Sequence, residues 1–291
     1  MTLTSDMKKT LLVCSAFLMG FCALAQENIY TLPLKSSGKK VRIALEEQRQ
    51  LTSRASKDSE PLFINKTQIV FSAEDESGQA DLILYSLDKN KFTNISMTKD
   101  RQEALPKMTD CGFYVSSLTQ DEEGLQRLYL YPTNLAEPEL LYDDLHPLLD
   151  YCWYDNHAVL SLGGEQPRTL YARSRENPIL LATKALSHLA YRPKSTHISY
   201  LEGDQLFVLE IVENAIPALY TRMPEGTTAY RWLSPKLLLA ANAEGSTTAM
   251  KRMPTGRYSA GRCLRRLGNY RISCTGKSRP FSIQWKGVRG M

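Results

Sequence analysis

The sequence predicts an all-β fold, a six-bladed-type β-propeller of four-stranded blades whose last blade is incomplete or altered. Short alternating strands recur between polar or Gly-containing turns over residues 61–250, which is typical of all-β domains. The repeat period is near 40 residues, as expected for propeller blades. Its markers are spaced by 46, 42 and 36 residues, at Leu82, Leu128, Leu170 and Leu206. Helical repeats would instead place apolar residues three and four apart over longer runs.

Residues 1–25 are typical of a bacterial signal peptide. Lys8 and Lys9 precede an apolar run over 11–24, and Ala23-Leu24-Ala25 forms an A-x-A cleavage site. We therefore expect a periplasmic or secreted protein, without a stable membrane span in the mature chain. A lipoprotein cysteine at Cys22 is one alternative, but bulky Phe21 precedes it where a small residue is needed. An uncleaved anchor would need a longer apolar run.

Residues 26–60 are predicted to hold N-terminal strands, over 29–34 and 41–45, followed by a polar segment over 48–58. Pro33 favours an edge position because proline cannot donate to a strand ladder. An N-terminal strand can complete the last blade of a propeller and so remove exposed edges. Either predicted strand could close the ring, and the sequence leaves that choice open.

Residues 61–250 hold the propeller repeats. Each repeat has an alternating strand that we interpret as an inner strand, then a polar turn and two further strands. The predicted inner strands are 68–72, 113–116, 158–161, 198–201 and 237–240. The third and fourth strands are predicted over 81–85, 127–131, 169–172 and 205–208, and over 91–95, 139–142, 178–181 and 217–220.

One repeat carries a family resemblance. The segment 189–200, Leu-Ala-Tyr-Arg-Pro-Lys-Ser-Thr-His-Ile-Ser-Tyr, resembles the TolB-type propeller repeat, whose centre runs Pro-x-Trp-Ser-Pro-Asp-Gly-x-x-Ile-Ala-Phe. The chain departs from this pattern where Lys194-Ser195 replaces Asp-Gly and where Trp153 is displaced. Looser copies lie at 62–72, 106–117, 149–161 and 230–240. The resemblance implies a six-bladed propeller of the kind that docks onto partner lipoproteins or caps peptidases.

Residues 251–291 form a basic tail with eleven Lys or Arg and no Asp or Glu, whereas the rest of the chain has 25 basic and 31 acidic residues. The whole-chain charge of +5 therefore says nothing about nucleic-acid binding. Three interpretations remain open: a frame change in the coding DNA near Met250, a basic arm for acidic partners, or a divergent last blade.

Cysteines and acidic clusters are the remaining candidate features. Cys111 and Cys152 occupy non-corresponding repeat positions, so two buried free thiols are favoured over a disulfide, although an oxidising compartment permits one. Two acidic clusters follow corresponding strands and should lie on one face of the disc. Solvated turns are the ordinary interpretation, and a rim for a basic partner is the functional one. The candidate partner-binding residues are Glu74, Asp75, Glu76, Asp121, Glu122 and Glu123.

No motif for catalysis, metal or cofactor binding is present. The four histidines lack metal-ligand spacing, and the chain has no G-x-S-x-G elbow, C-x-x-C, P-loop or G-x-G-x-x-G. We therefore expect no enzyme activity, no cofactor and no nucleic-acid partner, although residues from several blades could assemble a triad. The tyrosines of the outer strands are interpreted as packing between blades, with their hydroxyls reaching solvent.

The sequence thus predicts a monomeric interaction scaffold that binds through a propeller face. By resemblance, its partner is a cell-envelope protein such as a peptidoglycan-associated lipoprotein. Two alternatives stay open, a propeller that binds glycans or small ligands and a remnant of the gating domain of a serine peptidase. The sequence identifies neither the ligand nor the strand that closes the ring.

Overall fold

The computed structural model describes residues 26–37, 40–54, 57–173, 177–242, 247–252, 258–262, 269–274 and 281–287. The predicted signal peptide (1–25) lies outside the described residues, as do the side chains of the predicted basic tail. The described chain is almost entirely β-structure, with one short 3-10 helix at Leu45–Glu47. No helix in these ranges is long and apolar enough to cross a membrane.

Four consecutive four-stranded antiparallel sheets form blades of a β-propeller. Blade 1 is β5 (Asp58–Phe63), β6 (Gln68–Glu74), β7 (Ala80–Ser86) and β8 (Lys91–Asn94). Blade 2 is β9 (Gln102–Met108), β10 (Tyr114–Gln120), β11 (Gln126–Pro132) and β12 (Glu139–Leu140). Blade 3 is β13 (Leu148–Tyr154), β14 (His157–Leu162), β15 (Arg168–Ala172) and β16 (Ile179–Ala182). Blade 4 is β17 (Ser187–Tyr191), β18 (His197–Glu202), β19 (Gln205–Glu210) and β20 (Ala218–Arg222).

Two further four-stranded sheets contain strands of the basic segment. The fifth sheet is β21 (Thr227–Ser234), β22 (Leu237–Asn242), β23 (Thr247–Arg252) and β24 (Tyr258–Arg262). The terminal sheet joins both ends of the chain in the order β25 (Asn269–Cys274), β26 (Phe281–Gly287), β1 (Gln26–Leu32) and β4 (Arg49–Gln50). A separate hairpin pairs β2 (Leu34–Ser37) with β3 (Lys40–Ile43).

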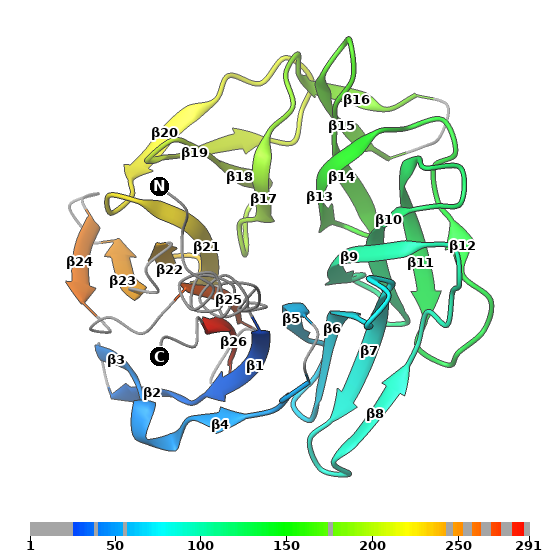
Figure 1. The fold of residues 1–291 in the computed structure, drawn as a ribbon. Coiled ribbons are helices and arrows are strands. Elements are labelled where there is room, and N and C mark those ends of the chain that lie inside the picture. The colour runs from blue at the N-terminus through cyan, green and yellow to red at the C-terminus, as the bar shows by residue number, and fades with distance from the viewer. Residues whose placement is uncertain are drawn as a thin grey trace, which may run out of the picture.

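The sheets are arranged around a centre that their first strands face (Figure 1). Contacts join β5 to β9, β13 to β17, β17 to β21 and β21 to β25, and β25 and β26 contact β5 in turn. The strands that the sequence suggested as inner ones, such as 68–72 and 198–201, are therefore the second strands of their blades. The first strand of each blade lies closer to the centre than the second strand (Figure 1).

Apolar side chains fill the seams between neighbouring sheets. In the seam between blades 1 and 2, Val70 packs in one cluster with Val115. Leu128 of blade 2 shares a cluster with Leu160 of blade 3. Equivalent clusters lie between blades 3 and 4 and between blade 4 and the fifth sheet. Because each sheet buries both faces against its neighbours, the second strands are almost wholly buried, as in β14 and β18.

The structure corrects two details of the sequence interpretation. The strand predicted over 29–34 ends at Leu32, and Pro33 separates β1 from β2, because proline cannot donate to the ladder. Trp153 is not displaced, because it faces the second strand as Tyr191 and Trp232 do. Residues 155–156 form the short turn that follows β13, whereas residues 192–196 form the longer turn that follows β17, and this difference shifts the motif in a sequence alignment but not in space.

Candidate functional site

A β-bulge interrupts the first strand of each blade where that strand borders the centre. The register shifts between Ser59 and Leu62 in β5 and between Ser187 and Ala190 in β17, with corresponding irregularities in β9 and β13. A bulge bends its strand and re-aims side chains, and it is common beside functional sites. These bulges could not be recognised in the sequence because no glycine marks them.

Non-glycine residues adopt the left-handed conformation at three of these bulges. Glu60 has a φ of 56°, Leu105 of 50° and His188 of 57°. An L-residue rarely adopts such backbone angles, and they are maintained only where the surroundings over-determine them. Strained backbone therefore recurs at the bulges of β5, β9 and β17. In blade 3 the irregularity lies between Leu148 and Asp150, and Asp150 itself pairs with Ser161.

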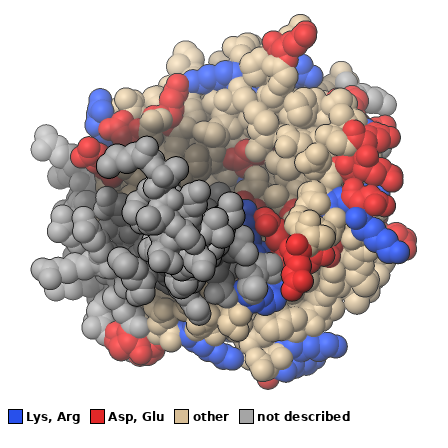
Figure 2. Space-filling view, viewed as in Figure 1, with Lys and Arg blue, Asp and Glu red and all other residues tan. Residues whose placement is uncertain are grey.

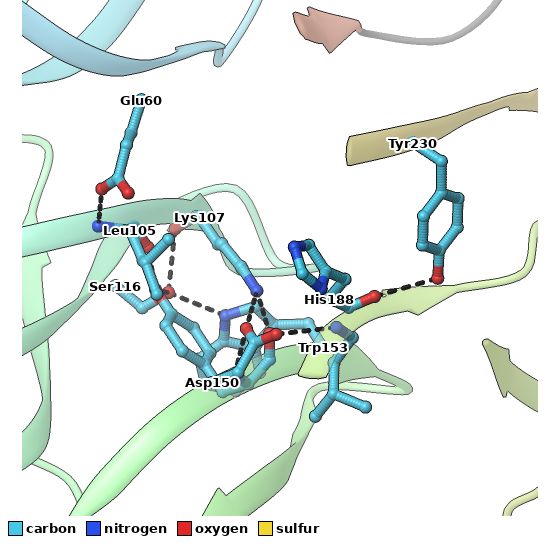
Figure 3. A network of polar contacts seen from close by, with 10 residues as sticks. Glu60, Leu105, Lys107, Ser116, Asp150, Trp153, His188 and Tyr230 are labelled. Atoms are coloured by element: carbon cyan, nitrogen blue, oxygen red, sulfur yellow. Dashed lines mark hydrogen bonds and ion pairs between the residues drawn. The ribbon is translucent and has the colours of Figure 1, made fainter. Parts of the chain in front are cut away.

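Charged side chains from successive blades meet at the bulges (Figure 3). Lys107 Nζ lies 3.0 Å from Asp150 Oδ1, joining blade 2 to blade 3, and also donates to the main-chain oxygen of Tyr151. The ammonium lies 4.5 Å from the centroid of the Tyr151 ring. The side chains of Lys107 and Asp150 are only 23% and 14% exposed, so solvent screens this pair less than a surface pair.

At two of the seams, a carboxylate of one blade accepts a hydrogen bond from a main-chain N–H at the bulge of the next blade. Asp150 Oδ2 accepts from the Leu189 N–H at 2.7 Å, which joins blade 3 to blade 4. Glu60 Oε2 accepts from the Leu105 N–H in the same way, which joins blade 1 to blade 2. A hydrogen bond to a charged acceptor is stronger than a neutral one. Each carboxylate therefore satisfies a backbone donor that the bulge removes from the strand ladder.

The other two seams use a Ser-Tyr-Trp cluster. Ser116 of β10 accepts from the Trp153 indole at 2.8 Å and lies 3.0 Å from the Tyr151 hydroxyl, which donates to the Leu105 oxygen. Ser199 of β18 receives the corresponding bonds, with the Trp232 indole and the Tyr230 hydroxyl both at 2.8 Å.

The tyrosine hydroxyl of each cluster donates a hydrogen bond to the main-chain oxygen of a bulge residue. Tyr230 donates to the His188 oxygen at 2.9 Å, as Tyr151 does to Leu105. Burial raises the pKa of both hydroxyls well above the ordinary value. Each hydroxyl therefore keeps its proton and stays a donor.

The acidic clusters predicted as partner-binding lie in hairpin turns between second and third strands. Asp75 Oδ1 accepts from the Ser77 hydroxyl at 2.6 Å, from the Ser77 N–H at 2.7 Å and from the Gln79 N–H at 3.1 Å. The hydroxyl bond first, and then the backbone bonds, hold the pKa of Asp75 below its ordinary value. Asp121 accepts from the Glu123 and Leu125 N–H groups at 3.1 and 2.9 Å. Both aspartates therefore build their own turns, as Asp commonly does.

The four glutamates of these clusters divide into two pairs. Glu74 forms an ion pair with Lys57 at 3.2 Å, and Glu123 pairs with Arg127 at 2.6 Å. Glu76 and Glu122 are exposed and contact no described charged residue. These two are the members of the predicted set whose charge the fold does not use.

Turns and bulges share one face of the disc. Glu74 N donates to the oxygen of Lys57, so the first acidic turn lies beside the start of β5, two residues before the Glu60 bulge. Gln120 pairs with Gln102, which places the second acidic turn beside the start of β9. We call the disc face that carries these turns the acidic face. In Figure 2, acidic residues also gather along the disc edge where Figure 1 places β11 and β12.

Cysteine and tyrosine environments differ in part from the sequence interpretation. Cys111 and Cys152 are free thiols as favoured, but Cys111 is exposed in the turn between β9 and β10, and only Cys152 is buried. Tyr131 does not reach solvent, because its hydroxyl donates to Oε1 of the buried Glu103 at 2.8 Å. Among the described residues, no group of three or more His, Cys, Asp or Glu could hold a metal ion.

Most polar groups at the bulges are committed to bonds that join the blades. The carboxylates of Glu60 and Asp150 bind backbone or a lysine, and the polar atoms of Asp150 are all engaged by Lys107, Tyr151 and Leu189. His188 is exposed beside them.

Comparison with known proteins reveals structural neighbours without close sequence relatives. No protein-family model matches the chain, and no curated protein matches it. TolB from Acinetobacter baumannii superposes with a TM-score of 0.62 at 12% identity, covering 83% of this chain and 65% of that one. The chain thus spans about two thirds of that TolB. A putative TolB from Agrobacterium tumefaciens gives a TM-score of 0.63 at 10% identity, covering 91% and 99% of the two chains.

A protein described as a putative gluconolactonase is also similar, with a TM-score of 0.57 at 14% identity and coverages of 84% and 93%. At these identities the similarity concerns the fold. The fold is that of a TolB-like β-propeller, and it occurs in this putative gluconolactonase as well as in TolB.

Proposed function

We propose that this TolB-like β-propeller is a non-catalytic scaffold in the periplasm or outside the cell, which binds a cell-envelope protein or peptide on its acidic face. The observation that carries the proposal is the joint position of two features on that face. Exposed carboxylates of Glu76 and Glu122 stand on the turns, and the polar bulges at Glu60, Asp150 and His188 surround the centre.

Electrostatic and geometric roles divide between these features. The outer carboxylates increase the encounter rate with a basic partner, since exposed charges act over about a Debye length, roughly 8–10 Å in physiological salt. The bulges form the stiffer central region, because each is tied to the next blade by a carboxylate or a tyrosine. A rigid contact surface reduces the entropy lost on binding.

We further propose that the fifth and terminal sheets complete a six-membered ring. β1 pairs with β26 on one side and with β4 on the other, and β25 contacts both β5 and β21. This pairing covers the strand edges that an open propeller would expose. Of the two closing strands expected from the sequence, 29–34 overlaps β1, whereas 41–45 overlaps β3, which pairs with β2.

Site-specific photo-crosslinking in the native host tests the binding proposal. A photoreactive residue replaces Glu122 or His188 on the acidic face, and in a matched control it replaces Lys66 in the β5–β6 turn on the opposite face. We expect the two acidic-face positions to capture the same envelope protein, identified by mass spectrometry, and the control to capture none of it.

Two results would count against the proposal. One is the absence of any crosslinked protein when the variants are folded and abundant. The other is equal capture from Lys66, which would place the contact on another surface. Capture of glycan-bearing material instead of protein would favour the glycan-binding alternative.

A further inference from the structure

Arg192 carries a positive charge into the seam between blade 4 and the fifth sheet. It follows β17 directly, and its guanidinium carbon lies 4.8 Å from the ring centroid of Tyr220 and 5.8 Å from that of Trp232. The residue as a whole is partly exposed, while its Nε is enclosed and has no hydrogen-bond partner among the described residues. The end of β17 lies on the disc face opposite the acidic face.

The charge of Arg192 has no described counterion. None of the ion pairs of the described residues includes this guanidinium. The main-chain N–H of Arg192 donates to the His197 oxygen, and its main-chain oxygen accepts from the Ser195 hydroxyl. Glu210, at the same end of the blade, accepts from the Thr196 hydroxyl at 3.2 Å. A partly buried cation with an unused donor is costly unless an anion or water completes it.

The fold does not require a cation at this position. Tyr154 is the equivalent residue of blade 3, because it follows Trp153 as Arg192 follows Tyr191 in the strand register. Its ring packs between Tyr171 and Tyr191, at centroid distances of 5.9 and 5.3 Å. A neutral aromatic ring thus fills the neighbouring seam in the same way, so packing alone does not explain the guanidinium.

Two lysines add positive charge to the same face. Lys194 lies in the β17–β18 turn and Lys236 in the β21–β22 turn, and both are exposed. These turns belong to the two sheets that form the Arg192 seam. Lys194 adopts a left-handed φ of 58°, which fixes the turn that carries it.

We propose that Arg192 binds the oxyanion of a small acidic ligand, a carboxylate or a phosphate, at the seam between blade 4 and the fifth sheet. The guanidinium is planar and presents paired donors that match two oxygens of such a group. Tyr220 and Trp232 hold that plane in place by cation–π contact. This site is independent of the partner surface proposed on the acidic face.

Nuclear magnetic resonance titration of the folded mature protein tests the site. The reporters are the Nε–H of Arg192 and the indole N–H of Trp232, which donates to Ser199. The probes are glucuronate, its neutral counterpart glucose, and inorganic phosphate at constant ionic strength. We expect saturable shifts of both reporters in the millimolar range with glucuronate or phosphate, and none with glucose.

Variants separate binding from folding. Arg192→Tyr copies the neighbouring seam, so we expect a folded protein in which the Trp232 reporter no longer responds. Arg192→Lys should weaken the response about tenfold, because a lysine lacks the paired donors. Lys66→Gln, in the corresponding turn of blade 1, should leave it unchanged.

The two acidic probes distinguish the source of the oxyanion. A response to glucuronate alone assigns a carboxylate, and a response to phosphate alone assigns a phosphate. Unchanged reporters with both anions, or equal saturation in folded Arg192→Tyr, would overturn the proposal.

Discussion

The hydroxyl of Tyr151 donates to the main-chain oxygen of Leu105, 2.8 Å away across the seam between blades 2 and 3. Leu105 is the left-handed residue of the β9 bulge, so its carbonyl points away from its own ladder toward the next blade. The Tyr230–His188 pair repeats this relationship two blades later, at 2.9 Å. Seams fastened by a carboxylate alternate with seams fastened by a tyrosine.

Removing the Tyr151 hydroxyl should destabilise the propeller. Tyr151→Phe leaves the Leu105 carbonyl without that donor, and we expect the free energy of unfolding to fall by about 1–2 kcal/mol. Urea denaturation measures the change. Tyr154→Phe is the matched control, because no described residue forms a hydrogen bond with its hydroxyl, and it should change stability by less than about 0.5 kcal/mol. Equal effects of both variants would contradict a specific role for the Tyr151 bond.

Glu103 should make stability decrease as pH rises. Burial raises its pKa above the usual 4.5, and the nearby Asp81 carboxylate adds to that effect. The folded state therefore holds the proton more tightly than the unfolded state, so this contribution is complete below pH 4.5 and is lost as pH rises toward the folded-state pKa. Glu103→Gln should flatten that part of the profile, measured by urea denaturation at several pH values. Parallel profiles for both proteins would contradict it.

The two acidic turns should separate folding from binding. Asp121→Ala removes the acceptor for the Glu123 and Leu125 N–H groups and the ion-pair partner of Arg127, so we expect a loss of about 2 kcal/mol in unfolding free energy. The double variant Glu76→Gln with Glu122→Gln should leave stability nearly unchanged. In the crosslinking assay it should reduce partner capture several-fold, more so at low salt. Undiminished capture at low salt would exclude these carboxylates from the interface.

Two thiols should differ in reactivity. Burial raises the pKa of Cys152 to about 12, whereas Cys111 is exposed. Since the thiolate is the reactive form, iodoacetamide should label Cys111 in the native protein and Cys152 only after unfolding. Peptide mass spectrometry reads both sites in one sample. Rapid labelling of native Cys152 would show that the seam between blades 3 and 4 opens.

Export should remove the N-terminal segment. If residues 1–25 are a signal peptide, the protein purified from the periplasm or medium begins at Gln26, as N-terminal sequencing would show. Ala25→Leu should block cleavage, so the variant should be heavier than the cleaved wild-type protein by the mass of residues 1–25. An intact N-terminus on the wild-type exported protein would contradict cleavage.

Much of the architecture could be predicted because it depends on local patterns. Alternating strands such as 68–72 and 205–208 lie within β6 and β19, and the Asp-containing turns follow the strands as expected. The acidic residues were predicted to share a disc face, which follows from their equal position within each repeat. Their individual roles could not be predicted, because Asp75 and Glu76 differ in which backbone donors they meet.

The central bulges could not be predicted, because the residues there lack a common chemistry. Glu60, Leu105 and His188 share only an unpaired position at a bulge, and Asp150 directly follows the irregularity of β13. These positions become visible only after the strands pair. The alternation of seams is visible in hindsight. Serine stands opposite a Tyr-x-Trp segment at Ser116 and Ser199, whereas Val70 and Val159 occupy that place in the carboxylate-fastened seams.

The sequence by itself determined a four-stranded repeat of the TolB-like type, because strand alternation and turn chemistry act within a few neighbouring residues. Tertiary structure alone decided that Tyr151 meets Leu105, that Asp150 meets Lys107 and Leu189, and that Arg192 lies between two aromatic rings. Those contacts join blades about 40 residues apart in sequence, and their partners are backbone atoms or faces of rings. Backbone atoms and ring faces cannot be recognised as partners from residue type, so these contacts are determined only when neighbouring blades pack together.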